Sequence, residues 1–515
     1  MDQRAQRAVV AGSTIAFAFA LLCGCGSTID DSNPTDPTDP TDPTDPTDPT
    51  IPDKFEVKLV ANGASGMQRV NFAVPLPIKK LTDASLRVLA GGAELPSARR
   101  VLATYPDGSA RSVQVQVDVD ITAVQALTIE LGTAGTNLDF VPVTATLTGT
   151  GNNVSPKVWA LLPTEVLTAT SIAGPVAPQS AVVGTPLDAW SALCDYQQWD
   201  TDAFLVNSAA SRDVWLFDRV TAMYRGYAIT GELSPLRSAY REAAIYQAGM
   251  TIQNGVATNI AVPTASTDLK YHYSQGMALH YLLTGDDRYR EAAEAISAKV
   301  VTMWDPNYDG TDEFWTERHA GFALLAHEWA VIVSDDKQAQ IAARADAAVT
   351  AFLAAQMAPR YGQTDTEARC FAHTATAHGE DWGGNGCSPW MSAILADALD
   401  AHARRVGGER ATQVNLALAR LGRILARDGR DSTGRPLYWM GVGTSADQLD
   451  DYDEHWGESA YVVALAWNAT GRTDTTLRAV ADELVAGVRD RGEVGQVRSF
   501  NWQCRSAVMA PALLR

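Results

Sequence analysis

The chain has 515 residues, 46% of them hydrophobic and 20% charged, which is long enough for two or three globular domains. Its formal net charge of -19 argues against nucleic acid as a partner, because phosphate binding requires a basic surface that this sequence does not offer.

The N-terminus has the features of an export signal. Two arginines precede an apolar run, 8–22, that is shorter than a typical membrane span and is followed by Leu22-Cys23-Gly24-Cys25. This boundary resembles a bacterial lipoprotein signal, and Cys25, which follows a small residue, fits the lipidated position better than Cys23. The resemblance implies a signal peptide over 1–25 and an exported protein anchored through Cys25 at the outer membrane or cell surface. A secreted protein with an incidental cysteine is the alternative.

Residues 26–53 are predicted to be a spacer. From Pro34 to Thr50, Asp-Pro-Thr repeats place a proline at every third position. Such a repeat favours polyproline II at about 3.1 Å per residue, and its aspartates repel one another. We expect an extended stalk of about 50 Å, which lifts the following domains off the membrane.

A small antiparallel β domain is predicted over 54–150, where short segments alternate apolar and polar residues between Gly, Pro and Asp turns. Three of its stretches are Phe72-Ala-Val-Pro-Leu-Pro77, Leu86-Arg-Val-Leu and Tyr105-Pro-Asp-Gly-Ser-Ala-Arg111. They resemble the N-terminal RIFT-barrel domain of the exo-rhamnogalacturonan lyase family, in which a similar β domain precedes an (α/α) toroid. The resemblance covers the β domain and the domain order, and it implies lyase chemistry on a polysaccharide.

Residues 151–210 are read as a linking segment packed on the toroid, and 211–515 as the all-α toroid itself. Apolar-periodic segments alternate with very short turns such as Ala228-Ile-Thr-Gly231 and Leu282-Leu-Thr-Gly285, which is typical of helical hairpins with glycine C-caps. Ser334-Asp335-Asp336 is a glycine-free version. Repeated hairpins of this size stack into a solenoid or close into a ring, and we predict an (α/α) toroid.

The long connections of this ring fall on the opposite face from the short turns, and such loops commonly carry function. They place polar and aromatic motifs at the starts of consecutive helices. The catalytic candidates are His272, Tyr273, Glu317, Arg318, His319, Glu380, Asp381 and His455. The substrate-binding candidates are Tyr271, Trp315, Trp382, Trp456, Asn501, Trp502 and Arg505. A structural hydrogen bond is the alternative role for His272, and a solvated helix start is the alternative for Glu317–His319.

These residues allow two kinds of cleavage. β-Elimination at a uronate needs a base, an acid and a group that neutralises the carboxylate; Tyr273 or His272 would serve as base or acid, with Arg318, His319 or Arg505 as neutralisers. Hydrolysis needs a pair of carboxylates, for which Glu317, Glu380, Asp381, Glu454 and Glu458 are available. The family resemblance favours the lyase, so a polysaccharide is the expected partner. A surface glycan-binding lipoprotein without activity is a further alternative.

One loop has calcium-like spacing. Asp305, Asn307 and Asp309 alternate as oxygen ligands before Gly310, but the twelfth position is Thr316 and lacks the usual glutamate. A structural calcium ion is the one cofactor we consider, and an ordinary Asp/Gly turn is the alternative.

Four cysteines follow the signal segment, and in an oxidising compartment they can pair. Pairing of Cys370 with Cys387 would close the loop that holds His378 to Trp382, although four cysteines allow three pairings.

Overall fold

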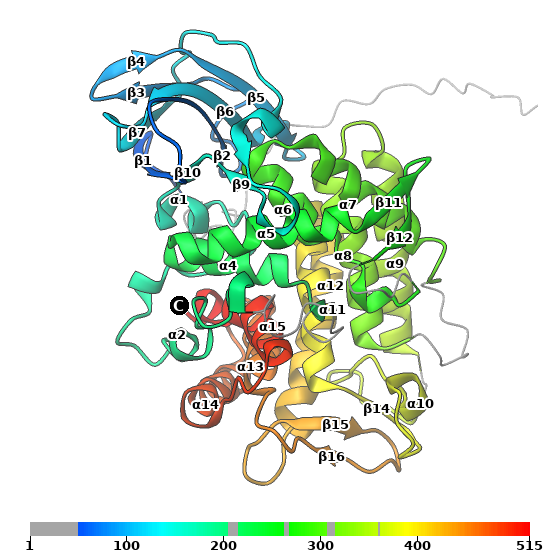
Figure 1. The fold of residues 1–515 in the computed structure, drawn as a ribbon. Helices are drawn as coiled ribbons and strands as arrows, with labels where there is room; N and C mark the ends of the chain where they lie inside the picture. Colours follow the sequence, from blue (N-terminus) through cyan, green and yellow to red (C-terminus); the bar gives the residue numbers. More distant parts are fainter. Residues whose placement is uncertain (1–49, 204–214, 262–266, 306–314, 359–360) are drawn as a thin grey trace, which may run out of the picture. The chain divides into compact units, whose positions relative to one another are not determined.

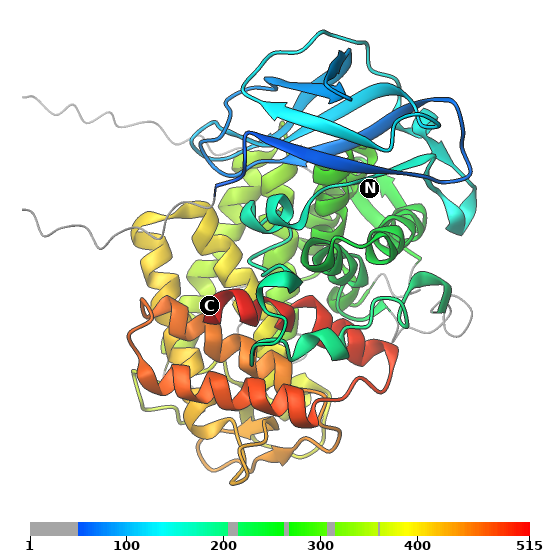
Figure 2. The same ribbon diagram turned by 90° about the vertical axis from the view of Figure 1, so that its left-hand side faces the viewer.

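The chain places a β domain first and a mainly helical part second, as shown from two directions in Figure 1 and Figure 2. The computed structural model describes residues 50–203, 215–261, 267–305, 315–358 and 361–515. Pro49–Arg515 forms one unit, so the β domain and the helical part can be described together. Cys25 and the stalk repeats lie outside the described residues, and their lipid anchor and extended form stay predictions.

Two antiparallel sheets build the β domain. One has the strand order β10-β1-β7-β3-β4 and the other β2-β6-β5. Their bounds are β1 (Lys54–Ala61), β2 (Met67–Pro75), β3 (Leu86–Ala90), β4 (Ala93–Leu95), β5 (Ser97–Thr104), β6 (Ala110–Asp120), β7 (Ala126–Leu131) and β10 (Val158–Leu161). In β1, alternate residues Phe55, Val57 and Leu59 are buried, as the period-two pattern predicts.

The second sheet is buried on both faces because a helical turn packs against it. Asn71 of β2 donates from Nδ2 to the carbonyl oxygen of Thr284 over 2.8 Å, and the hydroxyl of Ser112 in β6 donates to the carbonyl oxygen of Leu282 over 2.6 Å. Leu282–Gly285 is one of the predicted tight turns. The β domain therefore covers the tight-turn side of the ring at this hairpin and leaves the long loops free.

The sheet extends beyond residue 150, where the sequence analysis ends the β domain. β10 pairs with β1, with Leu161 opposite Lys58, after a short ladder of β8 (Leu147–Thr148) and β9 (Ser155–Pro156). The segment continues through α1 (Thr164–Ala169) and α2 (Trp190–Leu193). A disulfide between Cys194 and Cys504 then joins it to the last helices of the chain.

The helices form a closed ring of hairpins. The inner helices are α4 (Arg219–Thr230), α6 (Ser274–Thr284), α8 (Glu317–Val333), α11 (Pro389–Val406), α13 (Trp456–Ala469) and α15 (Val497–Arg505). Each contacts the next in this order, and α15 returns to α4, which closes the ring. The outer helices are α5 (Leu233–Ala248), α7 (Asp287–Val300), α9 (Gln338–Met357), α12 (Gly408–Asp428) and α14 (Thr475–Arg491). A β domain followed by an (α/α) toroid is thus confirmed.

Sequence pattern explains which helices are inner and which are outer. α8 is buried on nearly every side, as its almost continuous apolar sequence requires. α9 buries only Ile341, Ala345, Ala348, Phe352 and their neighbours on the same face, the spacing of a one-sided amphipathic helix.

The predicted tight turns are present and their glycines have the expected geometry. Gly231 and Gly285 end α4 and α6 at φ values of 69° and 71°, in the left-handed region that side chains with a Cβ adopt only with strain. The turn from α8 to α9 begins at Ser334 and contains no glycine, also as predicted.

Two long connections on the other side of the ring pair with each other. β13 (His373–Thr374) and β14 (Asn385–Cys387) come from the connection before α11, whereas β15 (Leu437–Gly441) and β16 (Gln448–Leu449) come from the one before α13. They form a single antiparallel sheet in the order β13-β14-β15-β16. This sheet fixes two otherwise irregular loops beside the starts of the inner helices.

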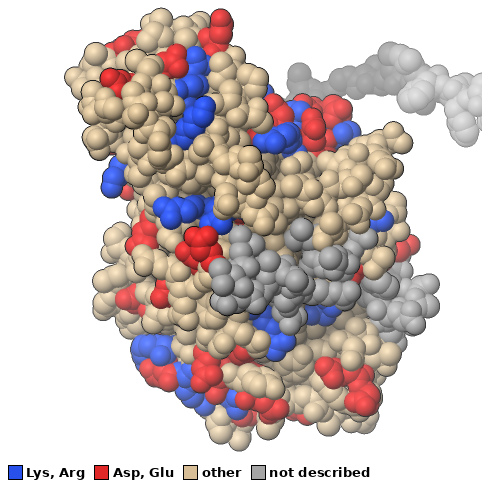
Figure 3. Space-filling model, viewed as in Figure 1, with Lys and Arg blue, Asp and Glu red and all other residues tan. Residues whose placement is uncertain are grey.

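Acidic and basic side chains are interspersed on the face drawn in Figure 3. Across the described ranges, no helix has both the length and the apolar character needed to cross a bilayer.

Candidate active site

The site is built around the indole of Trp390, in the first turn of α11. Five aromatic rings from five other parts of the chain lie around it, and their centroids are 4.8 to 6.2 Å from that of Trp390. These rings belong to Phe217, His378, Tyr438, His455 and Trp502. We call this group the Trp390 cluster. It forms because Pro389 starts α11 at the end of the long connection, so Trp390 emerges where the inner helices begin.

Arg318 adds a cation to the Trp390 cluster. Its guanidinium carbon lies 5.6 Å from the centroid of the Trp390 ring, and the side chain is half-buried. Within the described ranges no carboxylate forms an ion pair with it, and its Nε is buried without an acceptor. Burial lowers the pKa of Arg318, while the charge of Asp268 opposes that shift. An arginine in this state is suited to bind an anionic group of a ligand.

Tyr438 of β15 presents its hydroxyl at the same place. The side chain is partly exposed, and its ring centroid is 5.8 Å from that of Trp390. Burial raises the pKa of Tyr438, Glu380 raises it further, and Arg318 and Arg498 lower it. The net shift is upward, so the phenol keeps its proton at neutral pH. The hydroxyl can therefore donate a proton or a hydrogen bond to a bound molecule.

His378, at the end of α10 (Ala375–His378), has its ring centroid 5.4 Å from that of Tyr438 and 5.3 Å from that of Trp439. It is 8% exposed, and neither ring nitrogen has a hydrogen-bond partner among the described residues. Burial lowers the pKa of His378 to about 3, with Arg318 as the next cause. The imidazole is neutral at neutral pH and can accept a proton. Trp382 of the same loop is half-buried, with its ring centroid 5.5 Å from that of His378.

His455 stacks on Trp390, with ring centroids 4.8 Å apart and an interplanar angle of 6°. Its Nδ1 lies 3.6 Å from Oε1 of Glu458, and both side chains are buried. Burial raises the pKa of Glu458. Glu458 is therefore the acidic side chain beside His455 in the Trp390 cluster.

The carboxylates named as candidates differ in access. Glu317 is fully buried, and burial raises its pKa to about 8, so it is neutral at neutral pH. Glu380 is half-buried and acts on Tyr438, whereas Asp381 is exposed. The acids available to a ligand among these three are therefore Glu380 and Asp381.

His272 and Tyr273 do not reach the open side, contrary to our expectation. Tyr273 is 3% exposed, and its hydroxyl accepts a hydrogen bond from the backbone N–H of Phe217 over 3.0 Å. His272 is 1% exposed and is held at Nδ1 by the carbonyl oxygen of Asp268, 3.0 Å away. Burial raises the pKa of Tyr273 and lowers that of His272 to about 4. These two residues directly precede α6, whose first turn is buried in the interior of the ring.

The neighbours of these two residues are also enclosed. The Nδ1 of His319 is 2.7 Å from the hydroxyl of Thr316, and burial lowers the pKa of His319 to about 4. Tyr271 and Trp315 are buried as well.

Three further substrate-binding candidates are structural. Arg505 is buried and pairs with Asp397 over 3.1 Å, as Arg225 also does, so a charge cluster links α15, α11 and α4. Asn501 donates to the carbonyl oxygen of Leu216 over 2.8 Å. Trp456 packs against Gly487 of α14, away from the Trp390 cluster. Of the seven substrate-binding candidates, Trp382 and Trp502 are the ones that lie at the site.

The calcium-like loop lies mostly outside the described residues. Asn307 and Asp309 belong to 306–314, and Asp305 is exposed at the edge of that range. In the described part of the chain, three acids approach one another at Glu294, Asp335 and Asp336, but the Nζ of Lys337 already lies 2.6 Å from Glu294 Oε2. A calcium ion at Asp305, Asn307 and Asp309 stays a prediction.

Sequence reasoning did not nominate Trp390, Tyr438 or His378. His378 lies in the His-Gly-Glu-Asp-Trp motif that supplied Glu380, Asp381 and Trp382, so its position in the sequence also marked it as a candidate. Tyr438 and Trp439 are adjacent aromatics inside a long connection, a signal that the helix-start criterion overlooks.

The sequence matches no protein-family model and no curated protein. Among solved structures, it is similar to a glycosyl hydrolase family 88 protein from Bacteroides vulgatus, with a TM-score of 0.43, 10% identity and coverage of 63% of this chain and 99% of that one. It is also similar to a polysaccharide lyase, with a TM-score of 0.42, 9% identity and coverage of 63% of this chain and 97% of that one. A cellobiose 2-epimerase from Bacillus thermoamylovorans B4167 has a TM-score of 0.36 and 11% identity, with coverage of 54% of this chain and 74% of that one.

Proposed function

We propose that this protein is a carbohydrate-active enzyme that cleaves a uronate-containing polysaccharide by β-elimination. The observation that carries the proposal is the state of Arg318, a half-buried cation over Trp390 that has no acidic partner in the described part of the chain. A uronate carboxylate would supply that partner, and the aromatic rings around it offer faces for sugar rings.

The residues around Arg318 supply the other groups that elimination needs. Arg318 would bind the carboxylate and stabilise the negative charge that develops on it when the proton at C5 is removed. His378 would take that proton, and the electron pair would form the C4=C5 double bond as the C4–O bond breaks. Tyr438, which keeps its proton at neutral pH, would donate it to the leaving oxygen.

An acidic substrate would also activate His378. The charge of Arg318 is one cause of the low pKa of His378. A carboxylate bound to Arg318 offsets that charge and raises the pKa, so His378 becomes a stronger base when the substrate is in place. A neutral sugar at the same position would not have this effect.

Hydrolysis is the second candidate, and it is favoured by the access of two neighbouring acids, Glu380 and Asp381. Glu317 is enclosed and hydrogen-bonded, and Glu454 and Glu458 are also buried, so these three acids are not available for it. A hydrolytic mechanism with two carboxylates would therefore use Glu380 and Asp381 of the His378–Trp382 loop.

Incubation of the chain from Pro52 onward with a panel of acidic and neutral polysaccharides tests the proposal. We expect products with unsaturated ends, seen by their ultraviolet absorbance, from an acidic polysaccharide only. Reducing ends without that absorbance would favour the hydrolase. Binding without any product would make the protein a glycan-binding lipoprotein.

We also propose that the protein is exported and anchored through a lipid on Cys25, on the basis of the signal-like N-terminus and the stalk. Cys25→Ser should release it from membranes. An unmodified N-terminus on the native protein, measured by mass spectrometry, would rule the anchor out.

A further inference from the structure

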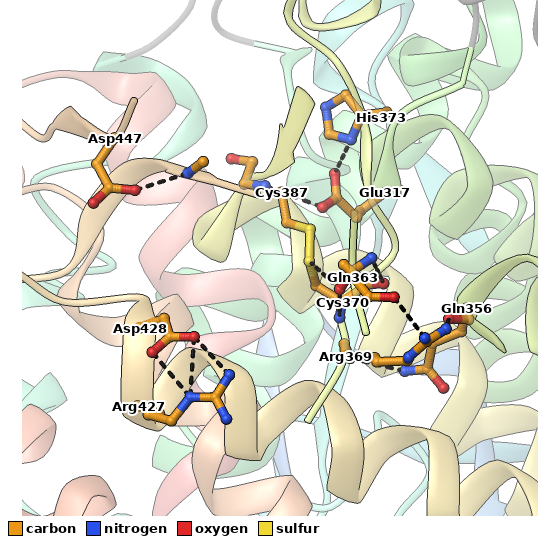
Figure 4. Close-up of a disulfide and its surroundings, with 12 residues drawn as sticks. Glu317, Gln356, Gln363, Arg369, Cys370, His373, Cys387, Arg427, Asp428 and Asp447 are labelled. Atoms are coloured by element: carbon orange, nitrogen blue, oxygen red, sulfur yellow. Dashed lines mark hydrogen bonds and ion pairs between the residues drawn. A yellow bond between two sulfur atoms is a disulfide. The ribbon is translucent and has the colours of Figure 1, made fainter. Parts of the chain in front are cut away.

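The buried carboxyl group of Glu317 lies where four parts of the site meet. Figure 4 shows its side chain directed at the ring of His373, close to the Cys370–Cys387 disulfide. Glu317 Oε1 accepts the backbone N–H of Ser388 over 3.0 Å, and Oε2 lies 3.1 Å from Nδ1 of His373, although that alignment falls short of a regular hydrogen bond. All three side chains are 0% exposed.

Each of these contacts leads to a residue of the proposed site. Glu317 immediately precedes Arg318 in α8. His373 is in β13, which runs directly into the short helix that ends at His378. Ser388 comes two residues before Trp390, and its hydroxyl donates to the carbonyl oxygen of Tyr438 over 3.2 Å.

We propose that Glu317 is a positioning residue that sets Arg318, His378, Trp390 and Tyr438 relative to one another, and that it acts as a neutral hydrogen-bonding group and not as a catalytic acid. This inference rests on the proposed function of that site. Glu317 contacts none of the reacting groups directly and holds the elements that carry them.

The neutral form fits the surroundings. An ionised carboxylate at full burial needs a cationic partner, and His373 is a poor one because burial holds its pKa well below the ordinary value. A protonated Glu317 instead accepts from Ser388 at Oε1 and presents its proton to His373 at Oε2. A glutamine has the same shape, with an acceptor oxygen and a donor nitrogen at those two positions.

The loop also has a covalent tie beside Glu317. Cys370 and Cys387 bracket His378 and Trp382, and their disulfide is one of the three pairings that the sequence allows. The disulfide joins the two ends of the loop to each other, whereas Glu317 joins them to α8. Glu317 therefore relates the loop to the helix that carries Arg318.

Three variants test this role. Glu317→Gln should keep kcat within about threefold of wild type, because it retains the hydrogen bond from Ser388 and the polar contact with His373. Glu317→Ala should lower kcat about a hundredfold with a smaller change in KM, the scale expected for misplaced reacting groups. Glu328→Gln is the matched control, since Glu328 is a buried glutamate of the same helix that contacts His402 and Arg405 and lies away from the site; its kcat should not change.

Hydrogen exchange gives a readout that does not depend on activity. Glu317→Ala should raise amide exchange in 371–388 and 437–441, and Glu317→Gln should not. Loss of activity in Glu317→Gln with unchanged exchange would overturn the proposal and assign Glu317 a proton-transfer role. Wild-type exchange in Glu317→Ala would overturn it as well. If the wild-type protein cleaves no polysaccharide, the proposed function fails, while the exchange data still decide whether Glu317 positions the loops.

Discussion

The guanidinium of Arg318 lies over the indole ring of Trp390 at 5.6 Å, with no acidic partner among the described residues. The two side chains come from different helices, α8 and α11, which pack side by side in the ring. Arg318 thus combines partial burial and a cation–π contact with an Nε that has no acceptor in the described part of the chain. This combination is costly for folding alone and is useful for binding an anion.

Arg318→Ala should raise KM and lower kcat together, because the guanidinium would hold the carboxylate both in the bound substrate and in the transition state. Arg318→Lys should recover only part of the loss, since an ammonium cannot bind a carboxylate through two parallel bonds. Steady-state kinetics on the cleaved polysaccharide checks both. Arg344→Ala, on the outer helix α9, is the control, and an equal effect there would contradict a specific role for Arg318.

Two tyrosine variants separate chemistry from packing. Tyr438→Phe should reduce kcat about a hundredfold or more with little change in stability, the scale of a lost general acid. Tyr273→Phe should leave kcat near wild type but lower the free energy of unfolding by about 1–3 kcal/mol, because the buried N–H of Phe217 loses its acceptor. Kinetics and urea unfolding on both variants provide the comparison. The reverse result would return Tyr273 to the catalytic role first expected for it.

Glu317 should make stability fall with rising pH over a defined window. Its pKa in the folded protein is about 8, against an ordinary value of 4.5. Between these values the folded state retains a proton that the unfolded state has lost, so the free energy of unfolding falls as pH rises and levels off above about 8. Glu317→Gln removes this contribution. We expect the variant to gain stability relative to wild type from pH 5 to about 8 in urea unfolding. A constant difference across that range would contradict the raised pKa.

The two disulfides should contribute unequally. Cys370–Cys387 spans 17 residues of sequence, and chain-entropy arguments give such a crosslink about 3 kcal/mol. Cys194–Cys504 spans 310 residues and should contribute more. Unfolding of Cys370→Ser/Cys387→Ser and Cys194→Ser/Cys504→Ser double variants, with the wild type under oxidising conditions, measures the difference. Equal losses would show that strain or residual structure outweighs loop length.

The sequence by itself determined the order of domains, the helical hairpins and the end of the ring at which the long loops gather. Those features follow from local rules: alternation in a strand such as Lys54–Ala61, one-sided periodicity in α9, and glycines such as Gly231 that must adopt positive φ. The pairing of Cys370 with Cys387 was one of the three that four cysteines allow, and the structure selects it.

Only the tertiary structure decided which of the candidate residues share a site. Helix starts such as those at Tyr273 and Arg318 look alike in sequence, yet the first is enclosed behind Phe217 and the second meets Trp390. The difference arises from how far each inner helix extends and from which long loop covers it. Tyr438 joins Arg318 because two loops distant in sequence pair as β14 and β15, and contacts of that kind leave no local pattern from which they could be predicted.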